Sequence, residues 1–189
     1  MVQRCEWVGK ETIYIKYHDE EWGGPEHDPR ALWEKLVLEG FQAGLSWITI
    51  LKKREGFRAA FAGFDPHKVA EFNDDDVERL LQDEGIVRHR GKINATIKGA
   101  RIWQEIEADI GFDKYIWDFV DGKPIQNNRA SLKDVPASTE LSAQMSKALK
   151  KRGFNFCGPT IIYAYMQAVG MVNDHTIDCH RYEAIKAMG

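Results

Sequence analysis

The stretch "LEGFQAGLSWITILKKRE", residues 38–55, decides how this chain is interpreted. Glu39 lies near the end of an apolar helical pattern, where a carboxylate is poorly placed for the helix dipole. The turn that follows contains Ala43 and Gly44, which let another group approach the backbone closely, and Trp47 comes next. A carboxylate and a tryptophan on either side of such a turn would hydrogen-bond and stack on a planar, electron-poor base. The same residues also fit a plain helix-turn-helix with a buried tryptophan.

Helix signals extend outward from this stretch over most of the chain. Asp28 and Asp65 each precede a proline, the pattern of an N-cap followed by proline in the first helical turn. Asn73 opens an acidic segment that we expect to be helical up to Gly85. The nearly all-apolar segment "GPTIIYAYMQAVG" predicts a central helix. Alternating strand patterns are scarce, so the fold class predicted is all-α and compact.

Composition is that of an ordinary soluble domain, with 43% hydrophobic and 29% charged residues among 189. We expect a single domain over residues 1–189, and a monomer. No apolar run reaches 18 residues, so no membrane segment is expected. The net charge of −3 gives no reason to expect nucleic-acid binding, although "VRHRGK" and "SKALKKRGF" are basic runs. Three cysteines cannot form an even disulfide framework, which favours a reducing, cytoplasmic setting.

Two pairs of metal-type ligands lie near the two ends of the sequence. His175 and Cys179 are four residues apart, which places both side chains on one face of a helical turn. Cys5 and His18 complete a Cys2His2 set, which would leave a bound zinc no open position and make it structural. The spacing of the N-terminal pair is not that of a zinc finger, so unrelated buried side chains are equally compatible with the sequence. His180 is a rival ligand.

Several segments resemble one enzyme family. They are "YHDEEWGGPEHD", the stretch 38–55, "GIVRHRGKI" and "SKALKKRGFNFCGPTIIYAYMQAVGMVNDH". These segments are similar to segments of the bacterial DNA-3-methyladenine glycosylase I family, and they occur in the same order along the chain. The resemblance runs from about residue 4 to about residue 182. It implies an all-α helix-hairpin-helix glycosylase fold in which one structural zinc joins residues 1–25, expected to be irregular, to residues 171–185. The zinc ligands implied are Cys5, His18, His175 and Cys179.

The resemblance also implies an activity and its residues. The activity is monofunctional hydrolysis of the N-glycosidic bond to 3-methyladenine in alkylated duplex DNA, with the base flipped into a pocket. Glu39 is the implied catalytic residue. The implied base-binding residues are Tyr17 and Trp47, with Trp7, Tyr14 and Trp22 as pocket walls. For DNA binding, our own hypothesis places Gln42, Gly44 and Leu45 at the gap left by the base, and Arg88, Arg90, Lys92, Lys147, Lys150, Lys151 and Arg152 at phosphates.

Some features depart from wider helix-hairpin-helix glycosylases. The expected hairpin, residues 85–92, lacks their Leu-Pro-Gly-Val-Gly form, and no counterpart of their catalytic aspartate is evident. Two rival functions therefore stay in view. A zinc hydrolase or base deaminase would need an open metal position and a His-x-Glu signature, which is absent. A helical DNA- or RNA-binding module would use the basic runs and release no base.

Overall fold

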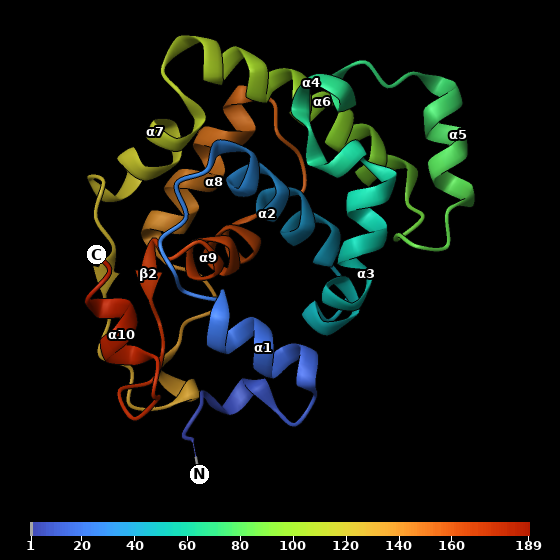
Figure 1. The fold of residues 1–189 in the computed structure, drawn as a ribbon. Coiled ribbons are helices and arrows are strands. Elements are labelled where there is room, and N and C mark those ends of the chain that lie inside the picture. The colour runs from blue at the N-terminus through green and yellow to red at the C-terminus, as the bar shows by residue number, and fades with distance from the viewer. Residues whose placement is uncertain (1) are drawn as a thin grey trace.

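Helices form nearly all the regular structure of residues 2–189, which the computed structural model describes (Figure 1). They are α1 (Thr12–Glu20), α2 (Pro29–Gln42), α3 (Trp47–Ala60), α4 (Pro66–Ala70), α5 (Asp74–Gln82), α6 (Arg90–Asp109), α7 (Phe112–Trp117), α8 (Glu140–Arg152), α9 (Pro159–Ala168) and α10 (Tyr182–Lys186). Four short 3-10 helices are η1 (Glu6–Val8), η2 (Ala62–Phe64), η3 (Asp118–Val120) and η4 (Leu132–Asp134). Strands β1 (Ile125–Gln126) and β2 (Val172–Asn173) pair in parallel. The predicted all-helical class is confirmed.

Helix α9 lies at the centre, as its apolar sequence predicts. It packs against both α2 and α8 (Figure 1). Ile162, Tyr165 and Met166 on α9 have no exposed surface and belong to the main hydrophobic core. Because α2 crosses this buried helix, the residues on the last turns of α2 are held on a rigid support.

The predicted helix starts are confirmed by their capping bonds. The Asp28 side chain accepts a hydrogen bond from the Ala31 amide at 2.7 Å, and Asp65 accepts one from the His67 amide at 3.1 Å. Asn73 forms a capping box with the third residue of α5. The end of α5 was predicted too late: the helix stops at Gln82, because the next residue has extended backbone and its carboxylate accepts from the Gly85 amide.

The prediction that residues 1–25 are irregular was wrong. This segment contains η1 and the nine-residue helix α1. No side chain caps the start of α1, and its β-branched Ile13 and Ile15 lower its intrinsic helix propensity. The helix is instead supported by burial of Tyr17 and His18, which are 4% and 0% exposed. Tertiary packing therefore supplies what the local sequence lacks.

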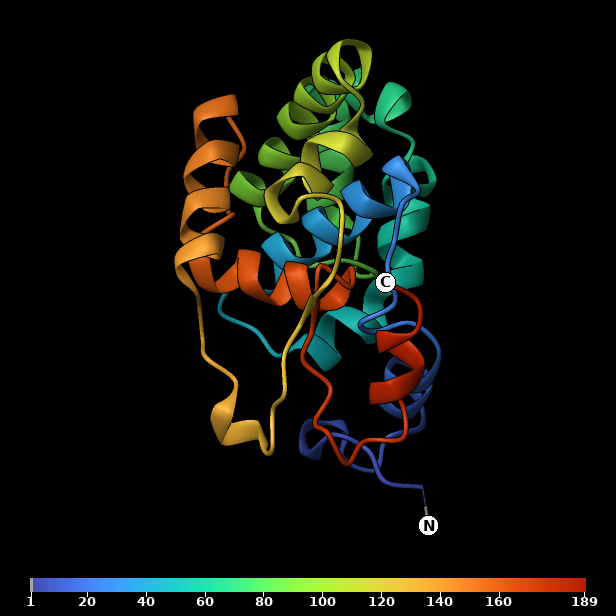
Figure 2. The same ribbon diagram turned by 90° about the vertical axis from the view of Figure 1, so that its left-hand side faces the viewer.

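The molecule has two parts, which lie one above the other in Figure 2. Figure 2 shows the helices α2 to α9 above, and α1, α10 and η4 below, with the N-terminus at the bottom and the C-terminus at mid-height. The N-terminal and C-terminal segments contact each other in the lower part, where the His180 amide donates to the Gln3 carbonyl oxygen at 3.0 Å. Of the helices within residues 2–189, none combines the length and the apolar character that a membrane crossing requires.

Candidate active site

A cavity of about 270 Å³ opens between the two parts of the molecule. Its walls come from η1 and α1 in the N-terminal segment, from α2 and α3, and from α9 and the segment after it. Five of the lining side chains are aromatic, namely Trp7, Tyr14, Tyr17, Trp22 and Trp47. The other lining residues are Cys5, Glu6, Glu39, Gln42, Leu132, Val135, Ala164, Gln167, Asp174 and Thr176. All five aromatic residues named from the sequence and Glu39 are thus brought together.

Glu39 lies on the last turn of α2 and is 4% exposed. Within residues 2–189 no hydrogen bond reaches its carboxylate, although burying a charged group without a partner is costly. Burial raises the pKa of Glu39 to about 8, while the positive charge of Lys35, one turn earlier on α2, acts in the opposite direction. A buried carboxyl with no partner that faces a cavity is a group that a ligand can engage.

The aromatic side chains of the lining form two groups of contacting rings. The rings of Tyr17 and Trp47 are 5.5 Å apart between centroids and tilted by 45°. Trp7 contacts Tyr14 and Trp22 edge-on, with centroid distances of 5.2 and 5.0 Å. The indole Nε1 of Trp47 is buried and has no hydrogen-bond partner in the described part of the chain. The lining therefore offers flat aromatic surfaces in the same cavity as the Glu39 carboxyl.

The Asp, Glu, Lys and Arg side chains that line the cavity are all acidic, although Glu39, with a pKa of about 8, is mostly neutral at pH 7. Glu6, Glu39 and Asp174 carry carboxyl groups, and no lysine or arginine is among the lining residues. Asp174 accepts hydrogen bonds from Asn127, Arg129, Tyr163 and Gln167, so its charge is held in place. The cavity consequently favours a neutral or cationic ligand over an anion.

Sequence reasoning missed the wall on the far side of the cavity. That wall contains Leu132, Val135, Gln167, Asp174 and Thr176. These residues come from η4, α9 and the chain after β2, and their spacing carries no periodic pattern. The one available signal was Asp174, a charged residue between apolar segments, which sequence analysis passed over in favour of its neighbour His175.

The turn between α2 and α3 has a defined geometry. Ala43 has φ −50° and ψ 117°, and Gly44 has φ +81°, the angles of a type II β-turn over residues 42–45. The Leu45 amide donates to the Gln42 carbonyl oxygen at 2.7 Å. Glycine suits the third position because its positive φ is unfavourable for other residues. The turn leaves Leu45 40% exposed at the surface.

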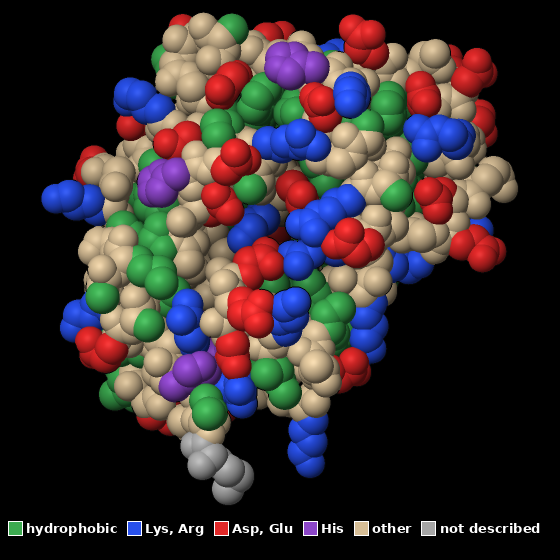
Figure 3. Space-filling view, in the orientation of Figure 1, with side chains coloured by type: hydrophobic (Ala, Val, Ile, Leu, Met, Phe, Trp, Pro, Cys, Tyr) green, Lys and Arg blue, Asp and Glu red, His purple; other side chains and the backbone are tan. Residues whose placement is uncertain are grey.

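The basic residues expected at phosphates fall into two groups. Exposed ones are Arg88, Arg90, Lys147, Lys150, Lys151 and Arg152. Arg90 is also paired with Glu78 at 2.7 Å. Lys92 differs from all of these, because it is buried and its Nζ donates to backbone carbonyl oxygens. On the face drawn in Figure 3, positive and negative side chains are intermixed and neither sign dominates.

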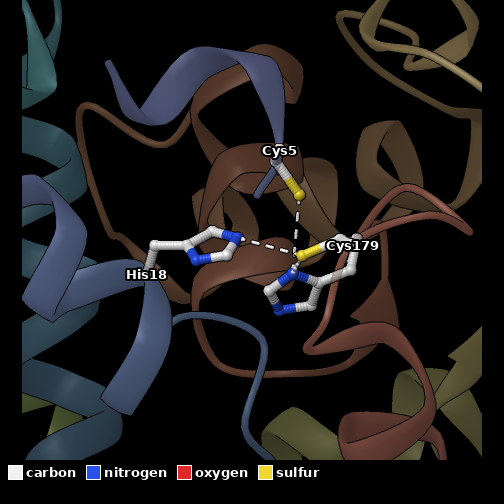
Figure 4. Close-up of side chains that lie close together, drawn as sticks. Cys5, His18 and Cys179 are labelled. Carbon is white, nitrogen blue, oxygen red and sulfur yellow. Dashed lines mark hydrogen bonds between the residues drawn. The ribbon is translucent and has the colours of Figure 1, made fainter. Parts of the chain in front are cut away.

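Cys5, His18, His175 and Cys179 form a buried cluster beside the cavity. Their ligand atoms all lie within 4.8 Å of one another, and Figure 4 shows Cys5, His18 and Cys179 pointing to a common centre. The segment that carries His175 and Cys179 is a turn, closed by a bond from the Cys179 amide to the Thr176 carbonyl oxygen. His180 lies outside the cluster and bonds to the Gln3 carbonyl oxygen instead.

The cluster fits a tetrahedral metal ion. With metal–sulfur and metal–nitrogen bonds of about 2.3 and 2.0 Å, a sulfur and a nitrogen on one zinc lie about 3.5 Å apart. The Cys179 Sγ is 3.4 Å from His18 Nε2 and 3.5 Å from His175 Nδ1, and Cys5 Sγ is 3.5 Å from His175 Nδ1. Hydrogen bonds, first from Cys5 and then from the two histidines, lower the pKa of the Cys179 thiol. The donor set and its dimensions therefore fit a four-coordinate metal ion such as zinc.

The ring nitrogens of His18 and His175 that face away from the cluster have hydrogen-bond partners of their own. His18 Nδ1 lies 2.7 Å from Asp19 Oδ1, and His175 Nε2 lies 3.1 Å from the Trp22 carbonyl oxygen. The Arg4 guanidinium, bonded to Asp19, lowers the pKa of that carboxyl to about 2. Such outer contacts orient metal-binding imidazoles. Because Trp22 also lines the cavity, the cluster and the cavity share a wall.

Comparison with known proteins gives one consistent result. The family model described as methyladenine glycosylase matches residues 7–182. DNA-3-methyladenine glycosylase 1 of Escherichia coli (strain K12) is 52% identical, over 98% of this chain and 100% of its own. A crystal structure of 3-methyladenine DNA glycosylase I superposes with a TM-score of 0.93 at 55% identity, covering 94% of this chain and 98% of the other. A variant of such an enzyme in complex with 3-methyladenine superposes with a TM-score of 0.92 at 38% identity, covering 95% and 97%.

Proposed function

Because this chain belongs to the methyladenine glycosylase family and is a glycosylase, we propose that it excises 3-methyladenine from alkylated duplex DNA as a monofunctional enzyme. The observation that carries the proposal is the unpartnered Glu39 carboxyl, which faces an aromatic cavity free of lysine and arginine. A base methylated at N3 is cationic while it is attached to the sugar. The acidic, aromatic cavity selects that charge and that flat shape.

The base reaches the cavity by leaving the helical stack of the DNA. Flipping costs a few kcal/mol and is least costly for a damaged base. Leu45, exposed on its type II turn, fills the gap that the base leaves, with Gln42 and Gly44 beside it. Exposed cations from the two basic runs contact phosphates and position the protein without reading sequence.

Inside the cavity, the chain's own groups hold the base and its charge. Trp47 and Tyr17 stack against the base, and Glu39 accepts a hydrogen bond from its edge and stabilises the positive charge. Although burial raises the pKa of Glu39, a cationic base favours the ionised carboxylate and so opposes the effect of burial. Binding of the cationic base is therefore coupled to ionisation of the Glu39 carboxyl.

The reaction itself is a hydrolysis. The bond between C1′ of the sugar and N9 of the base breaks, and its electron pair goes to the base, which leaves as neutral 3-methyladenine. Water adds to C1′ and releases its proton, which leaves an abasic site. Because the methylated base is already a good leaving group, strong acid catalysis is unnecessary.

The Cys2His2 cluster would hold one zinc ion with Cys5, His18, His175 and Cys179 as ligands. Four protein ligands fill a tetrahedral ion, so the zinc would supply structural cross-linking and no chemistry. This argues against a zinc hydrolase or deaminase, which keeps one position for water. We also propose that the enzyme acts as a monomer in the cytoplasm.

Analysis of released bases tests the function. Duplex DNA treated with a methylating agent is incubated with the protein, and the released bases are separated and identified. We expect release of 3-methyladenine, with 7-methylguanine left in place. Failure of folded, metal-loaded protein to release any base would contradict the proposal and favour a DNA-binding module.

Glu39→Gln tests the role of the carboxyl in the same assay. We expect a rate about 10²–10³-fold lower, the usual effect of removing one preorganised electrostatic group. Glu34→Gln is the matched control, because Glu34 lies on the same helix but pairs with Arg58 at 2.7 Å, outside the cavity. A wild-type rate in Glu39→Gln would remove Glu39 from the mechanism.

A further inference from the structure

Lys92 makes contacts unlike those of any other cation in the two basic runs. It is 7% exposed, and its Nζ donates to the carbonyl oxygen of Phe41 at 2.8 Å and to that of Ala43 at 2.9 Å. These carbonyls lie at the C-terminal end of α2, where backbone acceptors lack partners within the helix. A residue of α6 therefore caps the end of α2.

This placement is costly for a lysine. Within residues 2–189 no carboxylate lies within 4.0 Å of its ammonium. Lys92 is in the first turn of α6, where the helix dipole opposes a positive charge. Burial also lowers its pKa. The negative end of the α2 dipole and the two carbonyl oxygens offset these costs. The buried Lys92 side chain therefore holds the backbone where α2 ends and the 42–45 turn begins.

The turn over residues 42–45 has few other restraints. It contains one backbone hydrogen bond, and the Gln42 side chain adds a bond to the Leu45 carbonyl oxygen at 3.3 Å. Ser46, which precedes α3, does not cap that helix, because its hydroxyl is bonded to Thr49. The two bonds from Lys92 thus join the start of the turn to the start of α6.

We propose that Lys92 is a positioning residue that fixes the 42–45 turn relative to the 85–92 segment. This proposal rests on the proposed function. Arg88 and Arg90, on the 85–92 segment, are exposed and can contact DNA phosphates. Leu45, on the turn, enters the stack of DNA bases. Lys92 sets the distance between these two contacts. It does so through the protein backbone and touches no phosphate.

Amide hydrogen exchange of Lys92→Met tests the clamp directly. Methionine keeps the apolar stem and removes both hydrogen bonds. We expect amides of residues 43–46 to exchange at least about tenfold faster, since local opening is set by local restraints. Excision from duplex DNA should fall about 10- to 100-fold, because a misplacement of about 1 Å has effects of that size. Binding of free 3-methyladenine, followed by tryptophan fluorescence, should stay within about twofold, because the cavity is left intact.

Salt dependence separates positioning from phosphate binding. Each phosphate contact contributes about 0.9 to the slope of log affinity against log salt concentration. A positioning role leaves that slope unchanged in Lys92→Met, whereas loss of a phosphate contact lowers it by about that amount. Lys98→Met is the matched control, an exposed lysine on the same helix that should keep wild-type exchange in residues 43–46.

Unchanged exchange in residues 43–46, or a reduced salt slope, would overturn the proposal. If Lys92→Met does not fold, Lys92→Gln keeps an N–H donor on a shorter stem, and the same exchange comparison applies. The exchange measurement needs no activity, so it stands even if the wild-type protein releases no 3-methyladenine. That last result would contradict the proposed function and leave the clamp to be judged by exchange alone.

Discussion

At the scale of single residues, Glu39 shows how a functional group is held at a cost to stability. Folding removes its carboxyl from water and gives it no hydrogen-bond partner among residues 2–189. The folded-state pKa of about 8 lies above the ordinary value of 4.5, so folding takes up a proton between these pH values. The unfolded chain holds fewer protons there, and stability falls as the pH rises.

The stability of the wild-type protein and of Glu39→Gln should therefore diverge with pH. Below about pH 4.5 the carboxyl is protonated in both states and carries no penalty, and the penalty is complete above about pH 8. Each pKa unit corresponds to about 1.4 kcal/mol, so Glu39→Gln should be more stable by a few kcal/mol at pH 8.5. Urea unfolding at pH 5 and pH 8.5 measures both differences. Equal differences at the two pH values would mean that Glu39 is not buried in its charged form.

At the scale of elements, helix boundaries were predictable wherever one side chain fixes them. Asp28, Asp65 and Asn73 cap their helices by bonds to nearby amides, and such bonds are local in sequence. Helix α1 and the far wall of the cavity were not predictable, because contacts distant in sequence determine them. The contacts of Lys92 were not predictable for the same reason: its partners, Phe41 and Ala43, lie about fifty residues earlier.

The packing of α3 against the 85–92 segment gives a prediction for an element. Gly56 on α3 lies so close to Gly85 that an added Cβ would overlap the Gly85 backbone. Gly56→Ala must separate the two segments, and we expect a loss of about 1–3 kcal/mol, the usual effect of overpacking. Denaturant unfolding measures it.

Gly44→Ala is the comparison for Gly56→Ala, because it isolates the conformational effect. Nothing lies within 4 Å of the position of its Cβ, and only its φ of +81° is unfavourable. We expect it to cost about 1–2 kcal/mol from the backbone alone. Only Gly56→Ala should also move the 85–92 segment, which amide exchange would detect. A Gly56→Ala protein as stable as the wild type would show that this contact is not tight.

At the scale of the whole molecule, the metal cluster and the cavity depend on the same two ends of the chain. Cys5, Trp22 and Thr176 belong to the walls of the cavity: Cys5 is a member of the cluster, and the other two are hydrogen-bonded to His175 and Cys5, respectively. The cluster lies where α1 packs beside the turn after β2 (Figure 4). We expect loosening of the cluster to loosen the cavity as well, so the proposed structural ion would matter to function without taking part in the chemistry.

Cys179→Ala should lose metal and stability together. Structural zinc contributes on the order of 10 kcal/mol in zinc-finger peptides. A loss of about a third of that would lower Tm by roughly 6–12 °C in a protein of this size. Metal analysis by mass spectrometry and thermal unfolding measure the two effects. Cys157→Ala is the matched control, a buried cysteine outside the cluster that should keep its metal.

The meeting of distant segments at one cavity also sets an order of events during synthesis. Cys5 and His175 are 170 residues apart, so at about 5–20 residues per second the ribosome makes the second roughly 10–30 seconds after the first. Throughout that interval the nascent chain exposes Cys5 and His18 without their partners. The cluster and the cavity can therefore be completed only late in synthesis, after His175 and Cys179 have been added to the chain.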